Sequence, residues 1–447
     1  MSYNDDQSLD NSSSDDSLFT RFDEWQEQVV HKNRLVDNIA EDLLLNNLNL
    51  NEEGPTPRSG RRYFERQREH GHERLMNDYF VENPTYPPEI FRRRFRMRKP
   101  VFLRIMEAVT ANDEYFQQRP DAIGRRSLSP LQKCTGAMRV LAYGSSTDAV
   151  DEYLRMSAAV TRQSLMIFVE GVISCFGDEY LRRPNEQDMA SLLHAGEERG
   201  FPGMIGSIDC MHWEWKNCLT AWEGQYGGRS GKPTIILEAV ASYDLWIWHA
   251  FFGTPGSLND INVLHRSPVF NDALEGRAPK VSYVVNGSEY NMAYYLTDRI
   301  YHSWAAFVKS ITSPVIRKHK LFAQHQEGVR KDVERAFGVL QARFAFIRRP
   351  CLVWEKNLMA KIMMACIIMH NMIVEDERET YQTYYDPTEF LINDPIDNDQ
   401  NLQYSTELIA SLSAYMTNRE QLRNIEAHTA LKNDLVEHIW RKFSTTN

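Results

Sequence analysis

The sequence predicts an α/β protein in which an all-helical region precedes a mixed β-sheet with helices. At 447 residues the chain is long enough for two or three domains, and 42% hydrophobic residues supply a substantial core. Between about residues 61 and 200, apolar residues recur at helical spacing without strand-like alternation. At Gly203 the pattern changes to short apolar runs typical of strands, and helical spacing returns near residue 329.

The first 60 residues are predicted to form a disordered acidic tail. Residues 1–54 contain thirteen Asp or Glu and three Lys or Arg, so this segment alone has the net charge of the whole chain, -10. The remainder is close to neutral. The negative total therefore does not exclude a nucleic-acid partner, because the location of charge matters more than its sum.

Residues 61–200 are predicted to form a helical DNA-binding region. Helical runs at 146–156 and 161–176, joined by residues 157–160, have the arrangement of a helix-turn-helix, although an ordinary helical hairpin fits the spacing equally well. A basic segment, 92–104, has seven cationic residues and no acid, and 317–320 forms a smaller basic cluster. Such clusters either neutralise DNA phosphates or form solvated helix faces. The predicted DNA-binding residues of the first cluster are Arg92, Arg93, Arg94, Arg96, Arg98 and Lys99.

Residues 201–376 are predicted to form the mixed-sheet domain, followed by a polar linker and C-terminal helices over 377–447. The first three strand-like runs suggest a meander, and the fourth can enter the sheet beside the first. The segment 357–375 is apolar almost all round, so it is expected to be a buried helix and not a membrane span. The predicted strands cover residues 204–215, 233–243, 245–252 and 292–297.

Three carboxylates occupy positions that suggest metal-dependent chemistry. Asp209 interrupts an apolar strand, Asp298 ends another strand, and Glu334 lies on an amphipathic helix. Taken singly, they fit a core salt bridge, a turn cap and an exposed helix residue. Their joint order of strand, strand and helix is that of the ribonuclease-H-like nuclease fold. Because hard dications prefer oxygen ligands, these catalytic candidates predict a site for Mg2+ or Mn2+.

Other residues extend or compete with this prediction. Asp260, at the start of a short helix, is either an N-cap or first-turn acid or a fourth metal ligand. Arg330 shares a helix face with Glu334 and is a candidate for binding a DNA phosphate. The six cysteines contain no CxxC pair, so we expect reduced thiols in an intracellular compartment, with neither a disulfide framework nor a zinc site. A soluble protein is expected because no basic-then-apolar leader opens the sequence.

Four segments strongly resemble the PIF/Harbinger class of DDE transposases and their host-derived relatives, particularly the plant type. The resemblance extends over about residues 90–375. It is carried by GFPGMIGSIDCMHWEWKNC, KPTIILEAVASYDLWIWHAFFGTPGSLNDINVLHRSPVF, YYLTDRIY and RKDVERAFGVLQARFAFIRRP. In that family the acids of these segments are taken to bind divalent metals, and they correspond here to Asp209, Asp260, Asp298 and Glu334.

The resemblance implies a nuclear, Mg2+-dependent DNA endonuclease and strand transferase of a cut-and-paste transposon, or a host-derived relative. The implied partners are the transposon terminal repeats, target DNA and a Myb-like companion protein. A homo-oligomer is expected because two DNA ends must be brought together.

Four positions depart from the family pattern. Arg299 stands where glycine usually follows the aspartate, and His302 stands where Tyr-Pro usually closes the segment. Ala293 replaces a common glycine, and Gln341 replaces a frequent lysine. Arg299 motivates an alternative function, a catalytically inactive adaptor associated with DNA or chromatin, since an arginine next to a metal ligand can compete with the cation.

Overall fold

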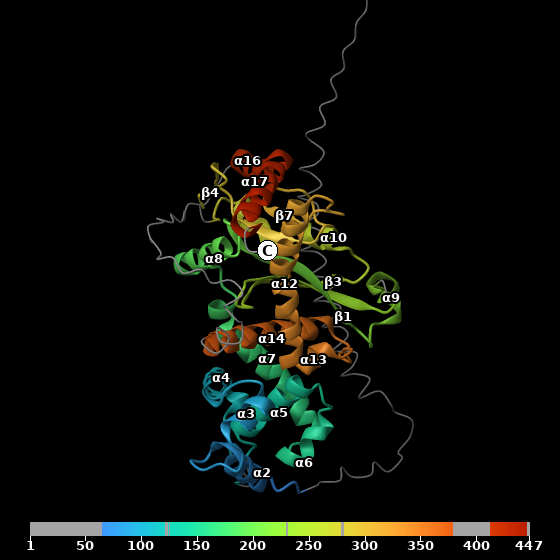
Figure 1. The fold of residues 1–447 in the computed structure, drawn as a ribbon. Helices are drawn as coiled ribbons and strands as arrows, with labels where there is room; N and C mark the ends of the chain where they lie inside the picture. Colours follow the sequence, from blue (N-terminus) through green and yellow to red (C-terminus); the bar gives the residue numbers. More distant parts are fainter. Residues whose placement is uncertain are drawn as a thin grey trace, which may run out of the picture. The chain divides into compact units, whose positions relative to one another are not determined.

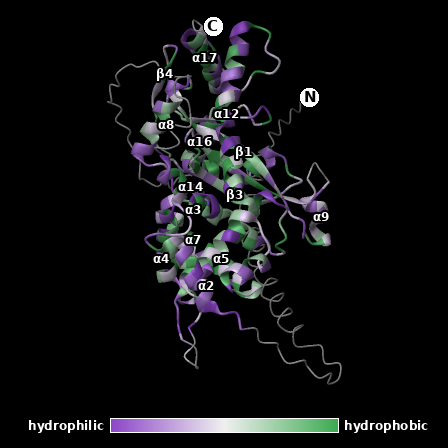
Figure 2. Cartoon of the chain, turned by 60° about the horizontal axis from the view of Figure 1, so that its bottom comes forward, coloured by the Kyte–Doolittle hydropathy of each residue, from purple (hydrophilic) through white to green (hydrophobic). Residues whose placement is uncertain are grey.

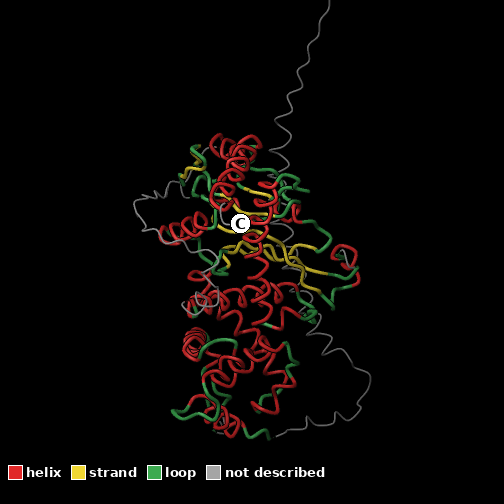
Figure 3. The backbone as a smooth tube through the Cα atoms, in the orientation of Figure 1, coloured by secondary structure: helices red, strands yellow, loops and turns green. Residues whose placement is uncertain are grey.

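A computed structural model describes residues 65–378, apart from 121–123, 125, 229–230 and 279–280, and residues 412–444. The described residues from Arg66 onward belong to one compact unit. The predicted acidic tail, 1–60, and most of the predicted polar linker lie outside the described residues. Figure 3 shows that the strands gather in one region of this unit and that helices make up most of the rest.

The described part of residues 65–200 is helical, as the sequence predicts. Local signals set several helix ends: Ser129 and Gln132 form a capping box, and Gly144 ends α5 in the left-handed conformation. The elements are α2 (Arg68–Leu75), the π-helix η1 (Met76–Phe80), α3 (Pro88–Phe95), α4 (Lys99–Asn112), η2 (Glu114–Phe116), α5 (Pro130–Tyr143), η3 (Asp148–Val150), α6 (Asp151–Leu154), α7 (Ala158–Tyr180) and α8 (Glu186–Glu198).

The predicted helix-turn-helix differs from the observed structure in its first helix. Instead of a helix over 146–156, the chain forms the 3-10 turn η3 and the single-turn helix α6. Arg155 ends α6 because it adopts a left-handed conformation, with φ of 57°. Ser157 then caps α7 by accepting a hydrogen bond from the Val160 N–H. The second predicted helix is therefore present, but a four-residue helix precedes it.

The sheet has five strands in the order β3-β2-β1-β6-β7. The first three strands form the predicted meander, and β6 lies beside β1, as predicted. The structure adds that β6 is parallel to β1. Strand β7, parallel to β6, was not predicted, and neither was the separate hairpin of β4 and β5. The strands are β1 (Met204–Glu214), β2 (Thr234–Ala241), β3 (Ile247–Pro255), β4 (Tyr283–Val285), β5 (Ser288–Tyr290), β6 (Tyr294–Thr297) and β7 (Phe307–Lys309).

Helices cover both faces of this sheet (Figure 1). The long helix α12 crosses one face and contacts β1, β2 and β6, while α10, α11 and α16 lie on the other side, where Ile208 and Val240 point. The remaining helices are α9 (Thr220–Tyr226), α10 (Asp260–Leu264), η4 (Pro268–Phe270), α11 (Asn271–Leu274), α12 (Arg317–Arg343), α13 (Ala345–Arg348), α14 (Lys356–Asp376), α16 (Leu412–Leu422) and α17 (Ile425–Phe443).

Helix α14 connects the sheet to the helical region. Its residues 362–374 are almost entirely buried against α7 and β3, which confirms the predicted buried helix. Hydrophobic residues gather along the strands and the adjacent helices in Figure 2. By length and composition alone, α7 and α14 are apolar enough to cross a membrane, but 72% of the apolar stretch of α14 is buried inside the protein. One core therefore extends across the predicted boundary at residue 200.

The C-terminal helices also join the sheet region. Leu431, Leu435 and Ile439 of α17 pack against Phe322 and Val329 of α12 in a second core. The sequence predicted helices here but not their packing, because the apolar stripe of α17 does not specify its partner.

Candidate acidic site at the sheet centre

Asp209 lies at the centre of the sheet, on the β1 face that meets α12. Alternation along β1 directs Ser207 and Asp209 to this face, where the Ser207 hydroxyl donates to the Val329 carbonyl of α12. The Asp209 side chain is 18% exposed. Burial raises its pKa to about 6, partly offset by a hydrogen bond from the Cys210 N–H and by the charge of Arg330. This site therefore contains a carboxylate that is costly to ionise without a nearby cation.

Arg330 provides such a cation between two of the predicted catalytic acids. Its guanidinium Nη1 lies 3.2 Å from Asp209 Oδ2, and Nη2 lies 2.9 Å from Glu334 Oε1. Glu334 is one helical turn further along α12 and is 44% exposed. The structure thus brings Asp209 and Glu334 to opposite sides of one guanidinium. The sequence had assigned Arg330 to a DNA phosphate and not to this pairing.

Asp260 contributes to the same site from α10. The N-cap of this helix is Asn259, whose side chain accepts from the Asn262 N–H, so the Asp260 carboxylate is not the cap. The charges of Asp260 and Glu334 both raise the pKa of Asp209. Acids of α10 and α12 are therefore both within electrostatic reach of Asp209.

Asp298 follows the end of β6, the parallel neighbour of β1. Gly206 pairs with Tyr295 and Ser207 with Leu296, so two further steps along both strands bring Asp298 level with Asp209. Asp298 is exposed, and its Oδ1 accepts a 2.6 Å hydrogen bond from the Arg299 N–H. The sheet therefore brings its backbone beside the acidic site, at the carboxyl end of β6.

The four predicted ligands are chemically suitable for a hard divalent cation, because each supplies carboxylate oxygens. They are Asp209, Asp260, Asp298 and Glu334. Within the described parts of the chain, however, no group of three or more His, Cys, Asp or Glu side chains is arranged to hold one metal ion. At Asp209 and Glu334 the space between the carboxylates is taken by the Arg330 guanidinium. A shared cation would therefore require this side chain to move.

The side chains of three residues that depart from the family pattern contact groups other than the candidate catalytic carboxylates. Arg299 Nη2 lies 3.9 Å from Glu327 Oε1, while the backbone N–H of Arg299 bonds Asp298. His302 stacks on Trp304 and lies 3.0 Å from His265 between their Nε2 atoms. Gln341 Nε2 approaches Met211 of β1. In this structure the side chain of Arg299 is directed toward α12.

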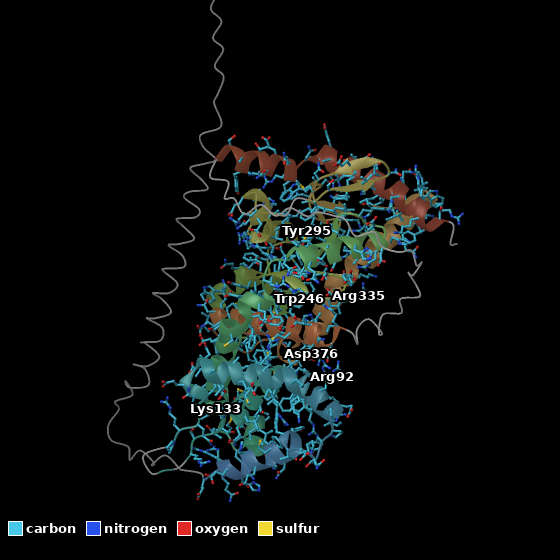
Figure 4. All side chains as sticks on the ribbon, turned by 90° about the vertical axis from the view of Figure 1, so that its left-hand side faces the viewer. Arg92, Lys133, Trp246, Tyr295, Arg335 and Asp376 are labelled. Atoms are coloured by element: carbon cyan, nitrogen blue, oxygen red, sulfur yellow. The ribbon has the colours of Figure 1, made fainter. Side chains whose placement is uncertain are left out.

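Most of the predicted DNA-binding cluster on α3 and α4 makes contacts within the protein. Arg92 pairs with Glu377, and Arg98 pairs with Asp376, which Figure 4 shows close to Arg92. Arg94 stacks over Tyr86, Arg96 lies over Tyr143, and the Lys99 ammonium donates to the Tyr79 carbonyl, whereas Arg93 is exposed. DNA binding by this cluster stays a prediction.

Sequence reasoning missed one buried acid near the site. Glu238 of β2 pairs with Cys210 of β1 and is fully buried, with its Oε1 3.5 Å from His249 Nε2. The signal was available, because Glu238 interrupts the apolar run 235–241 just as Asp209 interrupts its own. Close to it, the Cys210 thiol lies 3.7 Å from the Tyr301 hydroxyl. Further along, His212 Nδ1 lies 3.1 Å from the Thr234 hydroxyl, and the Cys218 thiol contacts the Leu219 carbonyl.

The fold and the site define an α/β protein with a mixed sheet and an acidic site, compatible with a ribonuclease-H-like fold. Residues 178–381 match a family model described as plant transposon protein, and residues 71–110 match a domain of unknown function. The chain is therefore similar to transposon-derived proteins of this kind over a little under half of its length.

The chain is also similar to curated proteins, one of which is named as a nuclease. The protein named "Putative nuclease HARBI1" from Rattus norvegicus is 21% identical over 264 residues, which cover 58% of this chain and 71% of the relative. "Protein ALP1-like" from Arabidopsis thaliana is 23% identical over 307 residues, which cover 66% of this chain and 72% of the relative. No solved structure is significantly similar.

Proposed function

We propose that this chain is a divalent-metal-dependent DNA endonuclease and strand transferase, or a host-derived relative that retains this chemistry. The observation that carries the proposal is that Asp209 of β1 and Glu334 of α12 both contact the Arg330 guanidinium, so that folding brings these two acids together. The charges of Asp260 and Glu334 add to the rise in the pKa of Asp209 that burial mainly causes. The strand order β3-β2-β1-β6-β7, with β6 and β7 parallel to β1, supports a ribonuclease-H-like nuclease domain.

In this proposal Asp209, Asp298 and Glu334 hold Mg2+ or Mn2+, and Asp260 assists. When bound, the metal lowers the pKa of a nucleophilic water or 3′-hydroxyl and stabilises charge on the phosphodiester. The role of the protein's own carboxylates is to hold the metal at a fixed place next to the phosphodiester. Asp209 and Glu334 would pair with a bound cation in place of Arg330, and the Arg330 guanidinium would then be available to contact a DNA phosphate.

A plasmid-nicking assay tests this proposal. Purified protein is incubated with supercoiled DNA and Mn2+, because a nick converts the plasmid to its open circle. Asp209→Ala and Glu334→Gln are expected to lower the rate by at least about a hundredfold, since each removes a metal ligand. Matched changes at exposed acids of the helical region, Glu107→Gln and Asp178→Asn, should leave it unchanged. Retained nicking in either site variant would refute the assignment.

A second function, a non-catalytic DNA- or chromatin-associated adaptor, is favoured by one specific observation. Arg330 already pairs with both Asp209 and Glu334, so part of their negative charge is offset by the protein itself. An adaptor binds DNA but does not nick it with Mn2+. The change Arg299→Gly restores the residue common in the family, and a gain of Mn2+-dependent nicking would identify a weakened nuclease.

We further propose a nuclear location, a homo-oligomer and a Myb-like companion protein, all on the strength of the family resemblance. Terminal repeats and target DNA are the proposed substrates. Size-exclusion chromatography with light scattering, with and without DNA, tests the oligomer: a monomer under both conditions would contradict it.

A further inference from the structure

A basic groove lies along α12, next to the acidic site. It is an open cavity of about 610 Å3 between α12 and the segment that precedes it. Its polar and charged lining, here called the α12 groove, comprises Arg299, Ser313, Lys320, Gln324, Glu327 and Lys331. A smaller hollow of about 160 Å3 shares Lys320 and Gln324 and adds Arg317 and Trp440. The two hollows therefore form one continuous surface.

Positive charge dominates this surface. Arg299, Lys320 and Lys331 line the α12 groove, against one carboxylate, Glu327. That carboxylate is partly balanced, because it lies 3.9 Å from Arg299 and accepts a 3.4 Å hydrogen bond from the Ser310 hydroxyl. Lys320 and Lys331 are exposed. Unlike Arg92 and Arg98, which are held by carboxylates, these two ammonium groups face solvent in the hollow.

The groove leads toward the candidate catalytic acids. Lys331 and Glu334 are three residues apart on α12, so they share a face and are separated by about 4.5 Å along the helix axis. Lys320 lies about 21 Å from Glu334 by the same rise of 1.5 Å per residue. Arg299 contributes from the other side, one residue after Asp298. The cations therefore follow a line that ends at the acidic site.

We propose that the α12 groove binds the phosphate backbone of the DNA strand that enters the acidic site. This inference rests on the proposed function and deepens it, because it names the surface that holds the substrate. Cations spread over some 16 Å, the axial distance from Lys320 to Lys331, match a strand whose phosphates recur every few ångströms rather than a single small anion. Arg299 acts here as a DNA-binding residue and not as a competitor for the metal.

DNA affinity measured without chemistry tests the groove. The probe is a fluorescein-labelled duplex of mixed sequence, followed by anisotropy in EDTA over a series of NaCl concentrations. The triple change Arg299→Gln, Lys320→Gln and Lys331→Gln removes three phosphate contacts. The slope of log K against log salt should become shallower by about 2 to 3, because each contact contributes about 0.7–0.9 to the slope. Affinity at moderate salt should fall at least about tenfold.

A matched control removes three exposed cations elsewhere: Lys216→Gln, Lys232→Gln and Lys361→Gln. It should keep the wild-type slope. The proposal would be overturned if the two triple variants had equal slopes of log K against log salt. It would also be overturned if the wild-type protein did not bind DNA. The single change Lys320→Gln, at an exposed position, repeats the test if the triple variant unfolds, and it should lower the slope by about 0.7–0.9.

The nicking assay separates this inference from the proposed function. If the groove variant binds DNA more weakly and the wild-type protein does not nick DNA, the proposed role of the groove stands and the proposed nuclease activity is rejected. If the groove variant binds DNA normally and nicking depends on Asp209, the proposed role of the groove is rejected and the proposed nuclease activity stands.

Discussion

Arg330 connects the two best-supported catalytic candidates. Its guanidinium contacts both Asp209 and Glu334. Burial, and to a smaller extent the charges of Asp260 and Glu334, raise the pKa of Asp209. The pairing explains how an acid can be accommodated on a buried strand without a bound cation. It also implies competition, because an arginine and a dication would neutralise the same oxygens.

The change Arg330→Gln should make the protein depend on metal for stability. Without metal, the variant should lose about 1–3 kcal/mol of unfolding free energy, because two carboxylates lose a partly buried partner. Mn2+ should then raise its melting temperature more than it raises that of the wild-type protein. Differential scanning fluorimetry with and without Mn2+ measures both effects. Arg335→Gln, which removes a partner of Asp332 outside the site, should not change the response to Mn2+.

For single residues, the sequence predicts which acids are important better than it predicts the side chains that pair with them. Asp209 could be selected because a charge in an apolar strand needs compensation. The same logic applies to Glu238 and would have found it. The Arg330 bridge could not be predicted, since it depends on how α12 packs across β1.

The helix α12 is the element on which both proposals depend. It carries Arg330 and Glu334 at the acidic site and Lys320 and Lys331 in the α12 groove. Gly338 lies on the same helix, where glycine costs about 1 kcal/mol of helix propensity relative to alanine unless a close contact requires it. In the structure an added Cβ at Gly338 meets no atom within 4 Å, so no packing contact inside the described protein requires glycine there.

Replacing Gly338 with alanine should therefore stabilise the protein by up to about 1 kcal/mol, because alanine has the higher helix propensity and the space is open. Urea unfolding measures this gain. If Gly338→Ala lowered the free energy of unfolding, the space around residue 338 would not be open as the structure shows. Gly196→Ala is the opposite control: its Cβ would lie 2.9 Å from two backbone oxygens, so destabilisation is expected there.

Elements were predictable where their pattern was long. The runs that became β1, β2 and β3 were found from apolar periodicity and the turn at Tyr243-Asp244. Strand β7 has three residues and carries too little pattern to find. The first helix of the helix-turn-helix was overestimated because nothing in the sequence signals the left-handed Arg155 that ends α6.

For the whole molecule, α14 is the structural connection between the helical region and the sheet. Its His370 is fully buried, with Nε2 donating to the Leu245 carbonyl and Nδ1 3.1 Å from Arg343 Nη1. Arg343 in turn lies 3.5 Å from Glu377. Burial, and secondarily the charge of Arg343, lower the pKa of His370 to about 3.

This shift predicts how the stability of the entire unit varies with pH. The unfolded chain protonates His370 below about pH 6.5, but the folded protein does not until about pH 3. Stability should therefore fall as pH decreases from 6.5, with a slope of up to about 1.4 kcal/mol per pH unit from this residue. Urea unfolding of wild type and His370→Gln at pH 7, 6 and 5 measures it. The variant should show a flatter profile, while the exposed His194→Gln should retain the wild-type slope.

The central claim is that the acids of β1 and α12 share a divalent cation. Electron paramagnetic resonance of Mn2+ tests it directly, because bound Mn2+ loses the six-line signal of the free ion. Wild-type protein should bind Mn2+, Asp209→Asn and Glu334→Gln should each weaken that binding at least about tenfold, and Asp178→Asn should not. Unchanged Mn2+ binding in both site variants would contradict the account.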